Sequence, residues 1–145
     1  MKKIILTIAI AISSFLAFAN ETKVSNTVLT AFSREFAGAK EVNWTSGNGF
    51  YKASFVYNNL HVAAFYSPEG EMIGMARNIS SLDLPMNLQT SLKKEYKDRW
   101  ITDLFELSNE DGTYYYITLE QADSKIVLKS DNGLQWTVYK KSSKA

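Results

Sequence analysis

Two similar stretches occur in this chain, and their similarity constrains the fold more than any other feature of the sequence. The first runs from Gly49-Phe50-Tyr51 to a turn at Pro68-Glu69-Gly70, and the second runs from Gly112-Thr113-Tyr114 to a turn at Asp131-Asn132-Gly133. Each reads as an aromatic strand, a short turn, a second strand and a tight turn that contains glycine. Internal similarity of this kind indicates a repeated structural unit. The sequence therefore predicts an α+β fold made by tandem duplication of a helix-plus-four-strand unit, with repeats at about 24–80 and 83–140.

The periodicity of apolar residues predicts a helix at the start of each repeat. Val24, Val28, Phe32 and Phe36 recur every four residues, which is typical of an amphipathic helix over 24–37. Pro85 suits the first turn of a second helix, which would present Leu88, Leu92 and Tyr96 as its apolar side. Strands are expected at 41–45, 50–57, 60–67 and 72–79, and again at 101–108, 114–120, 125–129 and 134–140.

Alternation within the strands predicts which side of the antiparallel sheet is buried. Side chains of a strand point alternately to its two faces. One face carries Tyr51, Ala53 and Phe55 in the first repeat, and the matching face carries Tyr115, Ile117 and Leu119 in the second. We expect both helices to pack on this face, because antiparallel hairpins bury one side of a sheet and expose the other.

The first residues have the pattern of a secretory signal peptide. Met1-Lys2-Lys3 is basic, Ile4 to Phe18 is almost wholly apolar, and Ala17-Phe18-Ala19 forms a cleavage site. We expect cleavage after Ala19, which leaves residues 20–145 as a periplasmic or secreted domain with no membrane insertion. The alternative is an uncleaved membrane anchor. The chain has no cysteine, so lipidation behind the signal, disulfides, zinc–thiolate sites and thiol catalysis are excluded.

The charge balance argues against polyanionic partners. Removal of Lys2 and Lys3 with the signal peptide changes the formal net charge from +1 to −1, and this near-neutral balance gives no electrostatic drive toward nucleic acid or anionic lipid. The basic segment Lys140-Lys141-Ser142-Ser143-Lys144 is predicted to be a frayed, solvated end of the chain.

No combination of residues predicts catalysis, a metal site or a cofactor. His61 is the only histidine and is expected to be an ordinary exposed strand residue. The carboxylates of the second repeat fall mostly in or beside predicted turns, and Asp131-Asn132-Gly133 lacks the further ligands of a calcium loop. Ser91 and Lys94 read S-x-x-K without the companion motifs of an acyl-transfer enzyme. The protein is therefore expected not to be an enzyme.

Aromatic residues on the uncovered sheet face are the candidate partner-binding site. If the helices cover the Tyr115 face, the opposite face presents a set that comprises Phe50, Val56, Tyr114, Tyr116 and Trp136. Aromatic rings provide contact area with few rotatable bonds to freeze, as protein and glycan ligands require. Two alternatives remain open: the rings cover one another, or the face assignment is inverted by one residue.

Several of these motifs resemble a known family. The strings Phe36-Ala37-Gly38-Ala39-Lys40-Glu41-Val42-Asn43-Trp44, Phe65-Tyr66-Ser67-Pro68-Glu69-Gly70 and Tyr115-Tyr116-Ile117-Thr118-Leu119 are similar to the secreted PepSY-like family of Bacteroidetes. The chain departs from it at Ala37, where members usually have proline, and at Tyr66, where they often have aspartate. The resemblance implies the fold of the two-copy β-lactamase-inhibitor protein and a periplasmic location, and it supplies no catalytic residues.

The function predicted from the sequence is a non-enzymatic periplasmic or secreted binding module. It would dock onto a protein partner in the cell envelope, as an inhibitor or accessory, and it would need no cofactor. The alternative is a domain that binds a glycan or small ligand in a groove between the repeats.

Overall fold

The computed structural model describes residues 23–144. The predicted signal peptide and its cleavage site lie outside the described residues. The chain divides into two compact units, and the boundary falls between Met75 and Ala76. The strands are hydrogen-bonded in the order β1 to β8, so that each strand pairs with its neighbours in sequence. Together with the two helices of residues 23–144, they make an antiparallel α+β arrangement.

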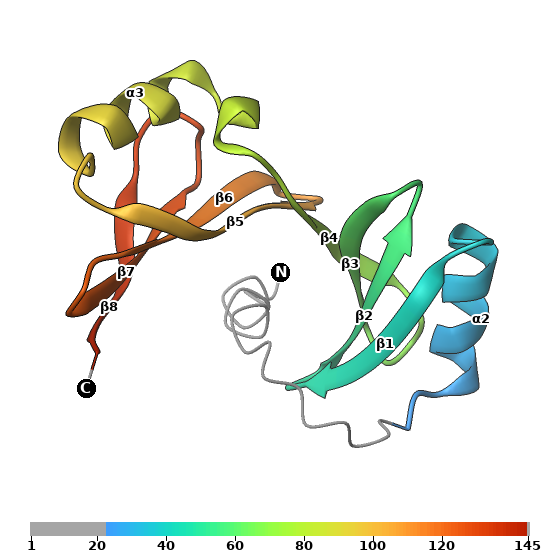
Figure 1. The fold of residues 1–145 in the computed structure, drawn as a ribbon. Helices are drawn as coiled ribbons and strands as arrows, with labels where there is room; N and C mark the ends of the chain where they lie inside the picture. Colours follow the sequence, from blue (N-terminus) through green and yellow to red (C-terminus); the bar gives the residue numbers. More distant parts are fainter. Residues whose placement is uncertain (1–22, 145) are drawn as a thin grey trace. The chain divides into compact units, whose positions relative to one another are not determined.

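The first unit consists of one helix followed by hairpin-connected strands (Figure 1). Its elements are α2 (Asn26–Glu35), β1 (Lys40–Gly47), β2 (Phe50–Tyr57), β3 (Leu60–Tyr66) and the first part of β4 (Met72–Asn78). Ser25 begins α2, because its Oγ accepts a hydrogen bond from the backbone N–H of Val28 at 3.4 Å. Asn58 and Asn59 connect β2 to β3 with positive φ angles of 51° and 65°, which are the angles that tight hairpins require.

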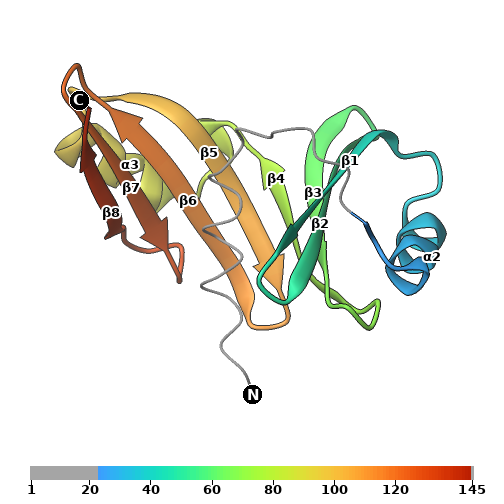
Figure 2. The ribbon, with the colours of Figure 1, turned by 90° about the horizontal axis from the view of Figure 1, so that it is seen from below.

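The second unit has the same order of elements, preceded by a short 3-10 turn. After β4 come η1 (Ser81–Asp83), α3 (Met86–Glu95), β5 (Trp100–Asn109), β6 (Gly112–Glu120), β7 (Ser124–Ser130) and β8 (Thr137–Ser143). The strands β5 to β8 lie side by side, and α3 covers one of their faces (Figures 1 and 2). The sequence did not predict η1, which is held by a reciprocal pair of hydrogen bonds between Ser80 and Asp83.

Each unit buries the predicted sheet face beneath its helix. In the first unit, Val28 and Phe32 of α2 pack on Ala53, Phe55 and other buried residues of the sheet. The Phe32 ring contacts the rings of Phe36, Trp44, Phe55 and Tyr66, with centroid distances of 4.9–6.4 Å. This aromatic packing explains why a helix of 10 residues is stable here, since so short a helix is marginal alone.

The core of the second unit is aliphatic. Leu88 of α3 is fully buried against Leu104, Ile117, Leu119 and Leu128 of the strands. The predicted alternation of β6 is therefore confirmed, with Tyr115, Ile117 and Leu119 on the helix side.

The turn before the last strand of each unit approaches the helix. Gly70 has φ +87°, and a Cβ there would lie 2.9 Å from Cγ2 of Thr27. Gly133 has φ +74°, and a Cβ there would lie 3.4 Å from Cγ of Pro85. In both units, glycine thus allows a backbone turn to lie against the start of the helix.

The structure corrects two predictions for the C-terminal strand. β8 begins at Thr137 rather than Leu134, because residues 131–136 form the connection from β7. The segment that was expected to fray belongs to β8, and Lys144 beyond it is anchored. Its Nζ lies 2.8 Å from the Glu120 carboxylate and 5.1 Å from the centroid of the Trp100 ring.

Candidate functional site

A group of aromatic and basic side chains lies on the face of the second unit opposite α3. It consists of Tyr114, Tyr116, Lys129 and Tyr139 together with the buried Phe105, and we call it the tyrosine surface. Cross-strand pairing places Phe105 and Lys129 on either side of Tyr116. The rings of Phe105 and Tyr116 are stacked with centroids 5.0 Å apart, and Tyr139 meets Tyr116 edge-on at 5.6 Å.

Lys129 is the charged centre of the tyrosine surface. Its Nζ lies 5.1 Å from the centroid of the Tyr114 ring and 5.7 Å from that of Tyr116, so both rings are within cation–π range. The Asp131 carboxylate lies 3.0 Å from the same nitrogen, and the Lys129 side chain is 13% exposed. The lysine is therefore held in one place by two rings and a carboxylate, while Tyr114 and Tyr139 stay half-buried.

Tyr116 is the buried member of the group. Its side chain is 1% exposed, and its hydroxyl has no hydrogen-bond partner among the described residues. Burial raises the pKa of the Tyr116 phenol well above its usual range, and the neighbouring Tyr139, Asp131 and Tyr114 raise it further. The phenol is therefore neutral at physiological pH. Tyr116 contributes a buried ring to the packing of this face and does not act as an acid–base group.

Two of the predicted binding residues are in the first unit, and only one of them is partly exposed. Phe50 was expected on an open face, but it is 3% exposed, so the expected exposure is wrong. Its ring lies over its cross-strand partner Gly47 and 5.8 Å from the ring of Phe65. Val56, which pairs with His61, is half-buried. For Phe50 and Tyr116, the alternative in which rings cover one another describes the structure better.

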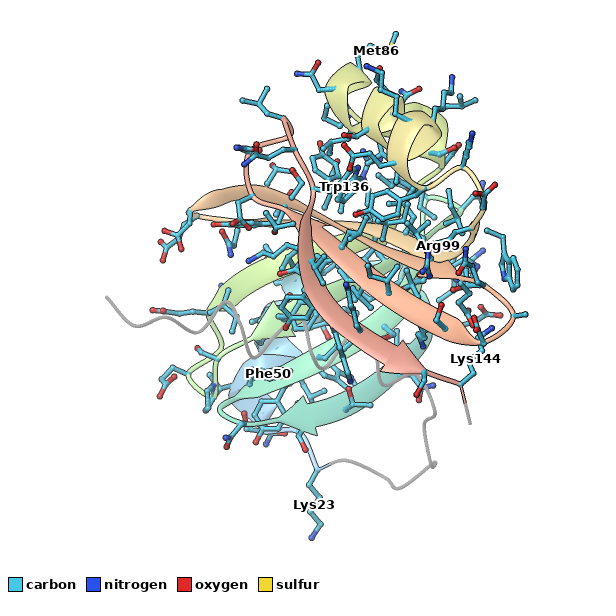
Figure 3. All side chains as sticks on the ribbon, turned by 90° about the vertical axis from the view of Figure 1, so that its left-hand side faces the viewer. Lys23, Phe50, Met86, Arg99, Trp136 and Lys144 are labelled. Atoms are coloured by element: carbon cyan, nitrogen blue, oxygen red, sulfur yellow. The ribbon has the colours of Figure 1, made fainter. Side chains whose placement is uncertain are left out.

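The expected position of Trp136 is wrong. The residue lies in the β7–β8 connection and packs against the core beneath α3 rather than on the opposite face (Figure 3). Its Nε1–H donates a hydrogen bond of 3.1 Å to the carbonyl oxygen of Leu88. Its side chain was placed by assuming the alternation of a strand, but Trp136 precedes β8, which begins at Thr137. Trp136 therefore joins the connection to the helix.

The titratable residues considered for catalysis take structural positions. His61 is exposed on β3, as predicted. Glu106 accepts a hydrogen bond from Nε of Arg77 at 3.1 Å. The Lys144 ammonium, through its hydrogen bond, lowers the pKa of the Glu120 carboxyl. Within residues 23–144, no group of three or more histidine, aspartate or glutamate side chains could hold a metal ion.

The two weak motifs also have local explanations. Asn132 Oδ1 accepts from the backbone N–H of Leu134 at 2.9 Å, and Ser130 Oγ accepts from that of Gly133 at 3.0 Å. The Asp131-Asn132-Gly133 segment is thus a turn closed by its own side chains. In the S-x-x-K motif, Ser91 is half-buried and Lys94 is exposed on α3.

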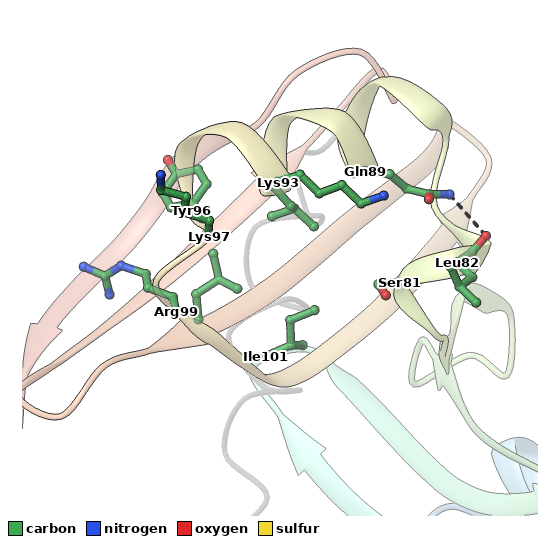
Figure 4. A pocket seen from close by; sticks show the side chains of 10 residues that line it. Ser81, Leu82, Gln89, Lys93, Tyr96, Lys97, Arg99 and Ile101 are labelled. Atoms are coloured by element: carbon green, nitrogen blue, oxygen red, sulfur yellow. Dashed lines mark hydrogen bonds between the residues drawn. The ribbon is translucent and has the colours of Figure 1, made fainter.

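A pocket of about 340 Å³ lies beside α3 in the second unit, and we call it the α3 pocket (Figure 4). Its apolar part is formed by Leu82 of η1, Leu92 of α3, Ile101 of β5 and Leu119 of β6. Leu119 is buried, whereas Leu82 and Ile101 are 80% and 44% exposed. Large apolar side chains are therefore open to water inside a hollow of ligand size.

The rim of the α3 pocket is polar and basic. Lys93, Lys97 and Arg99 contribute three positive charges, and no acidic side chain lines the pocket. Gln89 fixes one wall, since its Nε2 donates to the carbonyl oxygens of Leu82 at 3.2 Å and Leu84 at 2.8 Å. The sequence did not predict this pocket, because its residues come from separate elements of the second unit. The only sequence signal was the group of lysines on the polar side of the second predicted helix.

Neither α2 nor α3, the helices of residues 23–144, has the length and apolarity that crossing a bilayer requires. No protein-family model matches the sequence, and neither does any curated protein.

Solved structures from Bacteroides share the fold. A candidate periplasmic protein from Bacteroides eggerthii superimposes with a TM-score of 0.73 at 13% identity, covering 84% of this chain and 90% of that one. A BLIP-like protein from Bacteroides fragilis gives a TM-score of 0.65 at 17% identity, covering 84% and 87%. A DUF2874 family protein from Bacteroides uniformis gives 0.72 at 11% identity, covering 83% and 90%. The chain thus has a BLIP-like fold, and none of these three names states a reaction.

Proposed function

We propose that this protein is a non-enzymatic binding module of the bacterial cell envelope that docks onto a protein partner through the tyrosine surface. The observation that carries the proposal is the arrangement of the half-buried Tyr114 and Tyr139 with Lys129. Rings and a cation fixed in one arrangement lose little conformational entropy on binding, and tyrosine is enriched among the residues that dominate interface energies.

The signal-peptide pattern, the family motifs and the fold support the proposed location and family. The signal-peptide pattern of residues 1–19 directs the chain out of the cytoplasm, and a neighbour of the same fold is a candidate periplasmic protein. We assign the chain to the PepSY-like family on the motifs quoted above. The matching positions of Gly70 and Gly133 against their helices support an origin by tandem duplication.

Inhibition of an envelope enzyme is one form that this binding can take. A neighbour is named BLIP-like, and the tyrosine surface of this chain is a sheet face that α3 does not cover. Fold alone does not transfer function, so this form of the proposal is an analogy.

Quantitative co-purification tests the proposed surface. The double variant Tyr114→Ala/Tyr139→Ala should lose a partner that wild type retains from envelope extract of the native host. We expect the loss because truncating an aromatic residue at an interface hot spot costs about 2 kcal/mol or more, which is roughly thirtyfold in affinity.

The matched control is Trp100→Ala, which removes a 51% exposed ring outside the tyrosine surface. It should retain the same partner, and circular dichroism should show that all variants are folded. If the double variant keeps the partner, or if Trp100→Ala loses it equally, the tyrosine surface is not the docking site.

A further inference from the structure

The α3 pocket combines two features that a single kind of ligand would satisfy. Leu82 and Ile101 expose apolar surface inside the hollow, and burying such surface yields roughly 25 cal/mol per Å². A ligand with an apolar body would gain this burial. The volume of about 340 Å³ is at the lower end for a site that takes a small molecule.

The positive charges at the rim of the pocket indicate that the polar end of the ligand is anionic. Lys93 lies along the pocket toward Gln89, while Lys97 and Arg99 lie at the far end (Figure 4). No ion pair joins any of the three to an acidic residue of the described chain. Nη1 of Arg99 is buried and has no hydrogen-bond partner among the described residues. The exposed ammonium group of Lys97 and the neighbouring Arg99 thus have no carboxylate partner among residues 23–144, and an anionic ligand group would supply one.

The wall of the pocket is held in place before any ligand arrives. The two hydrogen bonds of Gln89 tie α3 to η1 and to the residue after it, and the Ser80–Asp83 pair closes η1. A preformed wall reduces the ordering that binding must accomplish.

We propose that the α3 pocket binds a small amphiphilic carboxylate, with its apolar body against Leu82 and Ile101 and its carboxylate at the end of the pocket formed by Lys97 and Arg99. The site is separate from the tyrosine surface, and the proposal goes beyond the protein-binding function. It adds a ligand whose presence would stabilise the native state of the second unit.

Decanoate is the probe for the test, and titration followed by amide NMR is the measurement. Decanoate should shift the amide signals of Ile101 and Leu119 and raise the melting temperature. Three controls separate the contributions: acetate lacks the apolar body, decanol lacks the charge, and decyltrimethylammonium reverses it. Each control should bind at least tenfold more weakly than decanoate.

A matched pair of variants assigns the charge to the rim. Lys97→Gln/Arg99→Gln should weaken decanoate binding at least tenfold. Lys94→Gln removes a charge from an exposed position of the same helix that does not line the pocket, and it should change binding less than twofold. The proposal is overturned if decanoate leaves the pocket amides unshifted, if decanol binds as well as decanoate, or if both variants bind like wild type. Because Tyr114 and Tyr139 stay intact, failure here leaves the protein-binding proposal to its own test.

Discussion

At the scale of single residues, the Tyr116 hydroxyl is a buried polar group without a partner in the described chain. Replacing Tyr116 by phenylalanine removes that hydroxyl and keeps the stacked ring, so we expect the free energy of unfolding at pH 7 to stay within about 0.5 kcal/mol of wild type or to rise. Tyr116→Ala should lose about 3–5 kcal/mol, because it empties the ring's place in the packing. Urea denaturation measures both, and a loss above about 1.5 kcal/mol for Tyr116→Phe would show that the hydroxyl has a stabilising partner.

The raised pKa values of Tyr66 and Tyr116 predict a loss of stability in alkali. Burial is the main cause for both phenols, and the Glu35 carboxylate contributes at Tyr66. Above a pH of about 10, the unfolded chain ionises these tyrosines while the folded chain keeps them neutral. The unfolded state then binds fewer protons, so the free energy of unfolding falls as pH rises.

Denaturant unfolding between pH 8 and 11.5 measures this dependence. The Tyr66→Phe/Tyr116→Phe variant should show a shallower decline than wild type above pH 10. Equal slopes for the two proteins would mean that the two phenols ionise normally in the native state.

At the scale of elements, two glycines separate backbone strain from contact with a helix. Gly49 and Gly70 have similar positive φ angles of 81° and 87°, but only Gly70 lies against α2. Gly49→Ala should cost about 1–2 kcal/mol through backbone conformation alone. Gly70→Ala should cost about 1–3 kcal/mol more, because its methyl group would meet Thr27. Equal losses in thermal or urea unfolding would show that the turn does not press on the helix.

The outer strand β8 carries lysines that protect its free edge. Lys140 and Lys141 are exposed beside the 51% exposed Val138, and charged side chains on an edge discourage pairing with another molecule. Lys140→Val/Lys141→Val should therefore self-associate on warming, as detected by light scattering. The variant Lys140→Glu/Lys141→Glu keeps charge at both positions and should scatter light no more than wild type. Aggregation of both variants alike would mean that charge is not what protects the edge.

Prediction from sequence succeeded at the scale of elements where a repeating pattern was long. The four-residue spacing around Phe32 and the alternation around Ile117 identified the helices, the strands and the buried face. Prediction failed where a pattern ended, as at Trp136. The strand β8 begins one residue after it, so strand alternation does not determine where the Trp136 side chain points.

For the whole molecule, the repeated order of predicted helices and strands indicated an α+β domain, and the solved Bacteroides structures bear out its BLIP-like fold. The sites were harder to predict. Exposure of Phe50 could not be judged, because the neighbour that covers it, Phe65, lies on another strand. The α3 pocket forms because Leu82, Lys93 and Ile101, which lie on three different elements, are close together in the fold. No local sequence pattern predicts that proximity.

In the proposed function, this protein holds another protein of the cell envelope at the tyrosine surface. Site-specific photo-crosslinking in the native envelope tests it most directly, with the crosslinker placed in turn at Tyr114, Tyr139 and, as the control, at Trp100. We expect a discrete protein adduct from the first two positions and none from the third. Adducts of equal yield from all three positions, or none from Tyr114 and Tyr139, would contradict the claim.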